Sequence, residues 1–168
     1  MKPTYHSLGD HTEAIQIDYD PIRISYEELL DIFWESHNPT MLSWSRQYMS
    51  AVYFHSEEQE RLVVETRNRE EAKRKTKIYT ETVPASEFYP AEAYHQKYLL
   101  RQRPALMKEF NAIYPNTEDF INSTAAARIN GYLGGYGTLT ALEAELNNLN
   151  LLPATSKKLL EILGELDR

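Results

Sequence analysis

The sequence predicts a fold in which helices pack against a β-sheet, of the α+β or α/β class. Two observations favour this class. The first half of the chain alternates between strand-like and helix-like patterns, whereas the second half is predominantly helix-like. At 168 residues, of which 42% are hydrophobic, the chain is also long enough to bury the core that such a fold needs.

The first predicted strand covers residues 14–19, where apolar and polar side chains alternate and would lie on opposite faces. Asp20-Pro21 predicts a turn after it. Ser25 and Glu28 then form a capping-box pattern, in which each side chain accepts a hydrogen bond from the other residue's backbone. We therefore expect a helix from this cap to about residue 35.

Two further strands and a second helix follow in alternation. Residues 49–54 have the β-branched and aromatic content of a buried strand, and Ser56 with Gln59 marks the start of a long, charged helix. Residues 78–83 form the third predicted strand, which Pro84 ends because proline lacks a backbone N–H.

The second half of the chain is predicted to be a set of helices. A proline in a first helical turn suggests that one begins near Pro90, and the glycine-rich segment 131–137 predicts a turn. The last two helices carry leucines on one face and are expected to form a hairpin. The other predicted helices cover residues 104–113, 117–129, 139–146 and 154–166.

Composition excludes several classes of function. Eighteen basic and 25 acidic residues give a net charge of −7, which argues against a nucleic-acid partner. No apolar run is long enough to span a membrane, and the N-terminal residues lack the layout of a signal peptide, so a cytoplasmic location is expected. The sequence has no cysteine, which excludes disulfides, thiolate metal sites and thiol catalysis by this chain alone.

The polar segment before the first predicted strand has the residues of half an active site. Tyr5 offers a phenolic hydroxyl, and Glu13, at the mouth of the strand, could act as a general acid. The alternative for Glu13 is an ordinary surface carboxylate. His6 and His11 could similarly form a metal pair or be solvent-exposed or hydrogen-bonded, and no metal is expected.

Three separated blocks of sequence, in the same order, resemble the A-type peptide methionine sulfoxide reductases. The first block holds Pro3-Thr4-Tyr5, Gly9-Asp10-His11-Thr12-Glu13 and Tyr19-Asp20-Pro21, the second contains Gln47-Tyr48-Met49-Ser50-Ala51, and the third contains Glu92-Ala93-Tyr94-His95-Gln96-Lys97-Tyr98. The resemblance covers about the first 100 residues and, loosely, the glycine-rich turn.

The resemblance implies a role for each matching residue. Glu13 would donate a proton to the sulfoxide oxygen, and Tyr5 and Tyr48 would hydrogen-bond it. His95, Tyr98 and Tyr132 would be substrate-binding residues. Ser43 stands where the family typically has an aspartate, and Leu133 where many members have a resolving cysteine.

The resemblance also implies substrate and reductant. The substrate would be methionine-(S)-sulfoxide, free or in peptides and proteins. No bound cofactor is expected, and the reductant would be an external thiol such as thioredoxin, glutaredoxin or dithiothreitol. Neither a nucleic acid nor a membrane is expected as a partner.

The expected domains are a partial reductase-like domain, residues 1–100, and a helical extension packing on it, residues 101–168. The first would have the family's ferredoxin-like sheet-and-helix layer without the N-terminal region that carries a Gly-Cys-Phe-Trp motif. The leading hypothesis is therefore a reductase whose true start lies upstream of Met1. The alternatives are a non-catalytic relative that binds methionine sulfoxide or a partner, and an inactive fragment.

Overall fold

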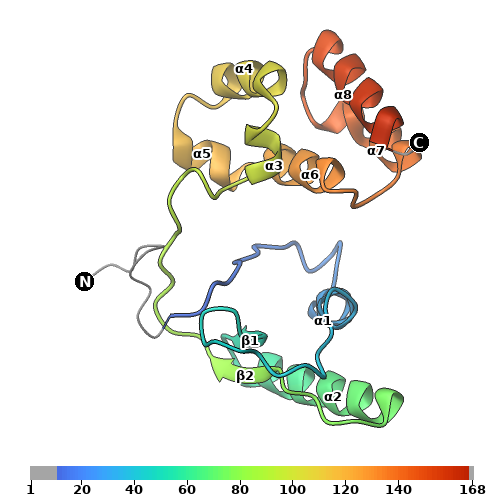
Figure 1. Ribbon diagram of the computed structural model, residues 1–168. Helices are drawn as coiled ribbons and strands as arrows, with labels where there is room; N and C mark the ends of the chain where they lie inside the picture. Colours follow the sequence, from blue (N-terminus) through green and yellow to red (C-terminus); the bar gives the residue numbers. More distant parts are fainter. Residues whose placement is uncertain (1–10, 167–168) are drawn as a thin grey trace. The chain divides into compact units, whose positions relative to one another are not determined.

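The computed structural model describes residues 11–166 of the chain, with the side chains of residues 11–165. The chain divides into two compact units, Met1–Pro90 and Ala91–Arg168, each described here by itself. The first unit combines helices with a small sheet, and the second is helical (Figure 1). This mixture of helices and a small parallel sheet with a helical C-terminal region confirms the predicted α+β class.

The first unit is built on a strand, helix, strand sequence. Strand β1 (Ala51–Phe54) pairs in parallel with β2 (Glu81–Pro84), and α2 (Glu57–Arg74) connects them. Parallel neighbours need such a crossover connection, which is why a long helix lies between two short strands. Helix α1 (Tyr26–Glu35) packs against α2 and crosses it (Figure 1).

The caps predicted for both helices are confirmed. The Ser25 side chain accepts from the Glu28 backbone N–H, and the Glu28 carboxylate accepts from the Ser25 N–H. The Ser56 side chain accepts from the N–H of Gln59 in the same way. These contacts satisfy backbone donors that a helix N-terminus leaves without partners.

A small core joins α1 to α2. Its buried apolar residues are Leu30, Trp34, Val63 and Ile78. Trp34 Nε1 also donates a hydrogen bond of 3.0 Å to Thr66 Oγ1, so the one polar atom of this buried ring has a partner.

The strand predicted for residues 14–19 is wrong, because residues 11–20 form neither helix nor strand. Ile15, which should have faced a core, is 84% exposed, and Ile17 is exposed as well. A strand is held by hydrogen bonds to a neighbouring strand. In the described part of the chain the only sheet is the β1–β2 pair, and this segment does not join it.

The third predicted strand is shorter than expected. Strand β2 begins at Glu81, whereas the prediction began at residue 78. The N–H of Ile78 donates to the Glu71 carboxylate, and the N–H of Tyr79 donates to the carbonyl of Pro39. These two N–H groups donate to a side chain of α2 and to a loop carbonyl, and therefore do not pair with a neighbouring strand.

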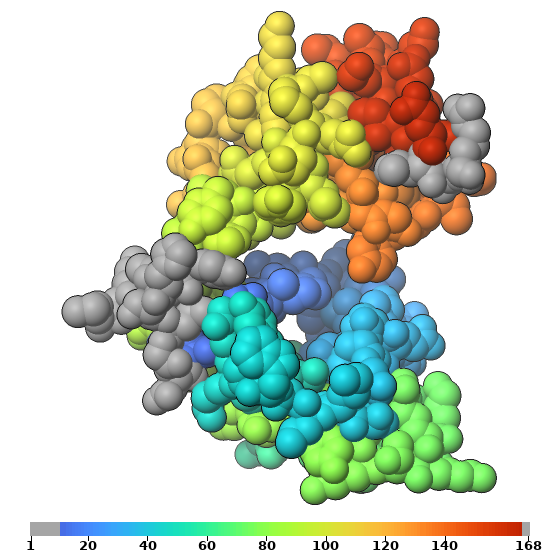
Figure 2. All heavy atoms as spheres, viewed as in Figure 1, coloured from blue at the N-terminus to red at the C-terminus, as the bar shows by residue number. Residues whose placement is uncertain are grey.

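Within residues 91–166, seven helical segments surround the core of the second unit, and their side chains pack closely (Figure 2, yellow to red). The core contains Leu100, Leu106, Phe110, Ile129 and Leu142, among others. The segments are α3 (Tyr98–Arg101), α4 (Pro104–Ile113), α5 (Thr117–Asn122), α6 (Thr124–Leu133), α7 (Leu139–Glu145), η1 (Leu146–Asn148) and α8 (Pro153–Leu166).

Two predicted helices of the second unit differ from the structure. The helix predicted over 117–129 is two helices, because Ser123 has extended backbone angles and its side chain caps α6 by accepting from the N–H of Ala126. The helix predicted from Pro90 starts only at Tyr98, after a series of turns. The predicted hairpin is present, since α7 contacts α8.

The leucines predicted to hold this hairpin together pack into the core of the second unit, as Leu142, Leu149, Leu159 and Leu163 are buried there. No helix in the described range 11–166 is both long and apolar enough to cross a membrane. The predicted domain boundary at residue 100 stays a prediction.

Candidate functional site

Two of the predicted site residues, Glu13 and Tyr48, are linked by a third side chain. Gln47 Nε2 donates a hydrogen bond of 2.8 Å to Glu13 Oε1 and one of 3.1 Å to the Tyr48 hydroxyl oxygen. The backbone holds the same arrangement, because the N–H of Glu13 donates to the carbonyl of Gln47 at 2.9 Å. We refer to Glu13, Gln47 and Tyr48 as the Gln47 network.

A second contact fixes the two segments side by side. The Thr12 hydroxyl donates a hydrogen bond of 2.9 Å to the carbonyl of Arg46. Residues 12–13 therefore lie against residues 46–47 through both backbone and side-chain hydrogen bonds. A carboxylate and a phenol are thus held next to one amide donor.

The Gln47 network is open to solvent. Glu13 is exposed, and Tyr48 is 44% exposed. Glu13 therefore does not lie at the mouth of a strand, which corrects that prediction. The strand itself is absent, so its expected burial is absent with it.

Gln47 was not among the predicted site residues. Its position beside Tyr48 in the Gln-Tyr-x-Ser-Ala block was the signal available in the sequence. Ser43, where the family typically has aspartate, stabilises the loop itself: its hydroxyl donates to the Ser45 carbonyl at 2.7 Å and accepts from the Ser45 N–H.

Three other residues of the N-terminal half, Tyr5, His6 and His11, were candidates for this site or for a metal pair. Tyr5 and His6 lie outside the described residues. His11 meets the ring of Tyr89 edge-on, with centroids 5.4 Å apart. Within residues 11–166 no group of three or more His, Asp or Glu side chains could hold a metal ion.

His95 and Tyr98 both lie at the surface of the second unit. His95 is exposed and packs against the ring of Tyr94, with centroids 4.2 Å apart. Tyr98, the first residue of α3, is also exposed. Between them Lys97 is partly buried, and burial lowers its pKa.

Tyr132 has a different setting, inside the core of the second unit, where it is 6% exposed. Burial raises the pKa of Tyr132, and a hydrogen bond to the Glu145 carboxylate raises it further. Glu145 also forms an ion pair with Arg128. The hydroxyl therefore belongs to a polar cluster within this unit, and a substrate-binding role for Tyr132 stays a prediction.

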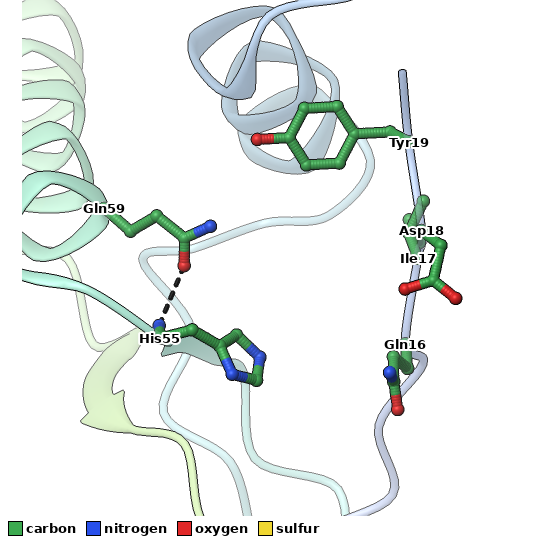
Figure 3. A pocket seen from close by; sticks show the side chains of 6 residues that line it. All are labelled: Gln16, Ile17, Asp18, Tyr19, His55 and Gln59. Atoms are coloured by element: carbon green, nitrogen blue, oxygen red, sulfur yellow. Dashed lines mark hydrogen bonds between the residues drawn. The ribbon is translucent and has the colours of Figure 1, made fainter. Parts of the chain in front are cut away.

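A surface hollow of about 400 Å³ lies elsewhere on the first unit (Figure 3). The segment 16–19 forms one side, and His55 and Gln59 face it from the other. Gln59 Oε1 accepts a hydrogen bond of 2.8 Å from the His55 N–H. None of the predicted site residues that lie within residues 11–166 lines this hollow.

Comparison with known proteins identifies the family. Residues 1–129 match the sequence model of the peptide methionine sulfoxide reductases. Residues 115–164 match a second model, described as the helical domain of selenoprotein methionine sulfoxide reductase A. Together the two matched ranges cover both units.

Individual relatives agree with the family match. The chain is 40% identical over 153 residues to a peptide methionine sulfoxide reductase of Drosophila melanogaster, covering 90% of this chain and 61% of the relative. It is 36% identical over 137 residues to peptide methionine sulfoxide reductase A5 of Oryza sativa, covering 78% and 53%. It is 45% identical over 108 residues to peptide methionine sulfoxide reductase A2 of Arabidopsis thaliana, covering 59% and 50%.

The chain therefore spans between half and about three fifths of the length of these relatives. The resemblance that the three blocks of sequence indicated is confirmed. On the family match and these identities, the chain belongs to the peptide methionine sulfoxide reductase family.

Proposed function

We propose that the chain takes part in reducing methionine-(S)-sulfoxide, in peptides or proteins, to methionine, and that its first unit handles the sulfoxide oxygen. The observation that carries this proposal is the Gln47 network, in which one amide donor binds both Glu13 and Tyr48. Membership of the peptide methionine sulfoxide reductase family indicates the reaction. The Gln47 network contains groups that suit one half of this reaction, the removal of the sulfoxide oxygen.

The reaction requires a nucleophile and a means of removing oxygen. Two thiols and one sulfoxide give a thioether, a disulfide and water: a thiolate attacks, the sulfur–oxygen bond breaks, and the oxygen leaves with two protons. Negative charge builds up on the oxygen as this bond breaks. A hydrogen-bond donor and an acid placed beside the oxygen therefore lower the barrier.

The Gln47 network offers both groups. The Tyr48 hydroxyl oxygen accepts from Gln47, which holds the phenol beside Glu13, and in this proposal its O–H would donate to the sulfoxide oxygen. Glu13, when protonated, would supply a proton to the leaving oxygen. Gln47 would act as a positioning residue, since it binds both groups. Tyr5, His95, Tyr98 and Tyr132 keep their predicted roles as part of this proposal.

The nucleophile is proposed to come from outside these 168 residues, because the sequence contains no cysteine. A thiol or a selenol would serve, and the matched helical-domain model is described as belonging to a selenoprotein. An external thiol protein as final reductant and a cytoplasmic location belong to the same proposal.

Calorimetric titration tests whether this chain recognises the sulfoxide. A peptide containing methionine-(S)-sulfoxide should bind more tightly than the same peptide with methionine. Tyr48→Phe should weaken sulfoxide binding about tenfold, which is the loss of one hydrogen bond to a strongly polar oxygen. Tyr79→Phe is a matched control, since Tyr79 lies in the same unit and is 43% exposed.

Equal affinity for the sulfoxide and methionine peptides would contradict the proposal. A second measurement checks the missing nucleophile: with dithiothreitol, the chain should reduce no more sulfoxide peptide than a blank without protein. Turnover above the blank would show that dithiothreitol is sufficient and that no nucleophile from another protein is needed.

A further inference from the structure

The loop before β1 carries an exposed pair of aromatic rings. Trp44 is 84% exposed and lies against Tyr48, with ring centroids 5.2 Å apart and a tilt of 42°. We call Trp44 and Tyr48 the aromatic ledge. Leu42, on the same loop, is exposed as well. Large exposed apolar side chains grouped on one loop are typical of a binding surface.

Hydrogen bonds hold this loop in place. The Ser43 hydroxyl donates a hydrogen bond to the Ser45 carbonyl and accepts one from the Ser45 N–H. The Arg46 carbonyl accepts hydrogen bonds from both the Thr12 hydroxyl and the Met49 N–H. The ledge is therefore exposed on a fixed backbone. A rigid aromatic surface loses little conformational entropy when a ligand covers it, which favours binding.

The ledge is continuous with the proposed oxygen-handling groups. Tyr48 belongs to both, because its ring packs against Trp44 while its hydroxyl accepts from Gln47. A sulfoxide oxygen at the Tyr48 hydroxyl would consequently place the neighbouring parts of its polypeptide within reach of Trp44. In the proposed function, the exposed Trp44 ring takes no part in removing the sulfoxide oxygen.

We propose that the aromatic ledge binds an apolar side chain next to the oxidised methionine, so that the chain prefers sulfoxides in apolar polypeptide segments over free methionine sulfoxide. This inference rests on the proposed function and adds a substrate class to it. Apolar contact with an indole ring is the interaction that an exposed tryptophan offers most strongly. Segments of this kind are exposed in unfolded and partly folded proteins.

The test compares ligands that differ only in what flanks the methionine. One peptide carries leucines on both sides of methionine-(S)-sulfoxide, a second carries serines, and the third ligand is N-acetyl-methionine-(S)-sulfoxide amide. Each peptide also has an unoxidised counterpart. The leucine-flanked sulfoxide should bind about tenfold more tightly than the other two sulfoxides, a typical contribution of one aromatic contact.

Trp44→Ala should abolish the advantage of the leucine flanks and leave the affinity for the serine-flanked sulfoxide unchanged. Ile22→Ala is the control, since Ile22 is 93% exposed on the same unit and outside the ledge. Fluorescence gives a second readout, because the other tryptophan, Trp34, is buried. The leucine-flanked peptide should shift the Trp44 emission to shorter wavelengths.

Equal affinities for the leucine- and serine-flanked sulfoxides, or an unchanged preference in Trp44→Ala, would overturn the ledge while leaving the proposed function intact. The unoxidised peptides test the opposite outcome, in which the ledge binds its ligand but the sulfoxide is not recognised. If leucine flanks strengthen binding through Trp44 but oxidation does not, the ledge stands and the sulfoxide assignment fails. Because Trp44 is exposed, Trp44→Ala should keep the wild-type circular dichroism spectrum.

Discussion

The two units of this chain differ in how they use apolar residues. In the second unit the apolar side chains of seven helical segments meet in one core. In the described part of the first unit the buried cluster consists of Leu30, Trp34, Val63 and Ile78, while Trp44 and Ile15 are largely exposed. Among the described residues, the second unit therefore buries thirteen apolar side chains in its core and the first unit four, although both units also expose large apolar side chains.

The two units also differ in where the polar side chains of the candidate site lie. The Gln47 network lies on exposed loops of the first unit, where a substrate can reach it. Tyr132, in the second unit, has its hydroxyl in a buried cluster with Glu145. Exposed loops on a small scaffold are where binding residues concentrate, and closed cores are where packing dominates.

Removing the centre of the second core should have the largest effect. Phe110 is fully buried, so Phe110→Ala should lower the free energy of unfolding of this unit by about 3–5 kcal/mol. Far-UV circular dichroism in urea measures this loss. Both tryptophans lie in the first unit, so the fluorescence transition should remain unchanged. Ile113→Ala, at an exposed position of the same helix, should cost far less.

An equal loss in Ile113→Ala, or a parallel shift of the fluorescence transition, would contradict this comparison. The first outcome would mean that the buried cluster is not what stabilises the second unit. The second would mean that the two units unfold together.

A glycine in the turn after α6 lies against a tyrosine ring of the second core. Gly137 has φ +106°, and a Cβ added there would lie 2.6 Å from Tyr132 Cε1. Gly137→Ala should therefore cost about 2–3 kcal/mol, from backbone strain and from displacement of the tyrosine ring. Gly135→Ala is the matched control, since Gly135 also has a positive φ but open space around it.

Thermal unfolding followed by circular dichroism would compare the two glycine variants. If both variants lose the same stability, the contact with Tyr132 contributes nothing and only backbone strain matters. A larger loss in Gly137→Ala would show that the Tyr132 ring is held by packing, as its burial indicates.

What the sequence predicted well depends on contacts between near neighbours. The caps at Ser25 and Ser56 need a partner three residues away, so the pattern contains the whole interaction. The strand over 14–19 was wrong because a strand depends on a distant partner that no local pattern reveals. The break at Ser123 was missed because a serine is compatible both with a helix interior and with a cap.

The candidate site divides in the same way. Glu13 and Tyr48 could be named from the blocks that resemble the family, but their link through Gln47 joins positions 34 residues apart. Only the fold brings those loops together. The sequence left open whether Glu13 is a surface carboxylate, and the alternating pattern beside it wrongly favoured a strand.

The small core of the first unit should depend on the buried hydrogen bond between Trp34 and Thr66. Thr66→Val keeps the shape of the side chain but leaves the Trp34 indole N–H without an acceptor. The expected cost is about 1–3 kcal/mol, the penalty for a buried unsatisfied donor. Thr66→Ser, which keeps the hydroxyl, should retain more of the stability. Tryptophan fluorescence in urea distinguishes the two, and an equal loss in both would mean that the hydroxyl acceptor for the Trp34 N–H is not what stabilises this core.

The smallest expected effect concerns an ion cluster on α2 and its dependence on pH. Glu70 is buried, and Arg74 Nε and Lys73 Nζ bond its carboxylate at 2.9 and 3.3 Å. Burial would raise the pKa of Glu70, but the hydrogen bonds and charges of Arg74 and Lys73 outweigh it and lower the pKa below 4.5. A lowered pKa in the folded state means that the ionised carboxylate stabilises the fold above about pH 4.5, and that this contribution is lost as the pH falls further.

Glu70→Gln should therefore cost on the order of 1 kcal/mol at pH 7 and less at pH 3, because the contribution of the ionised carboxylate decreases as the pH falls. The relevant quantity is the difference in unfolding free energy between wild type and variant, measured by tryptophan fluorescence at both pH values. Glu65→Gln, which removes an exposed ion pair with Arg61, should show little difference at either pH. A Glu70 difference that stays constant with pH would mean that the side chain contributes through packing, and the first unit would then resemble the second more closely than its exposed loops suggest.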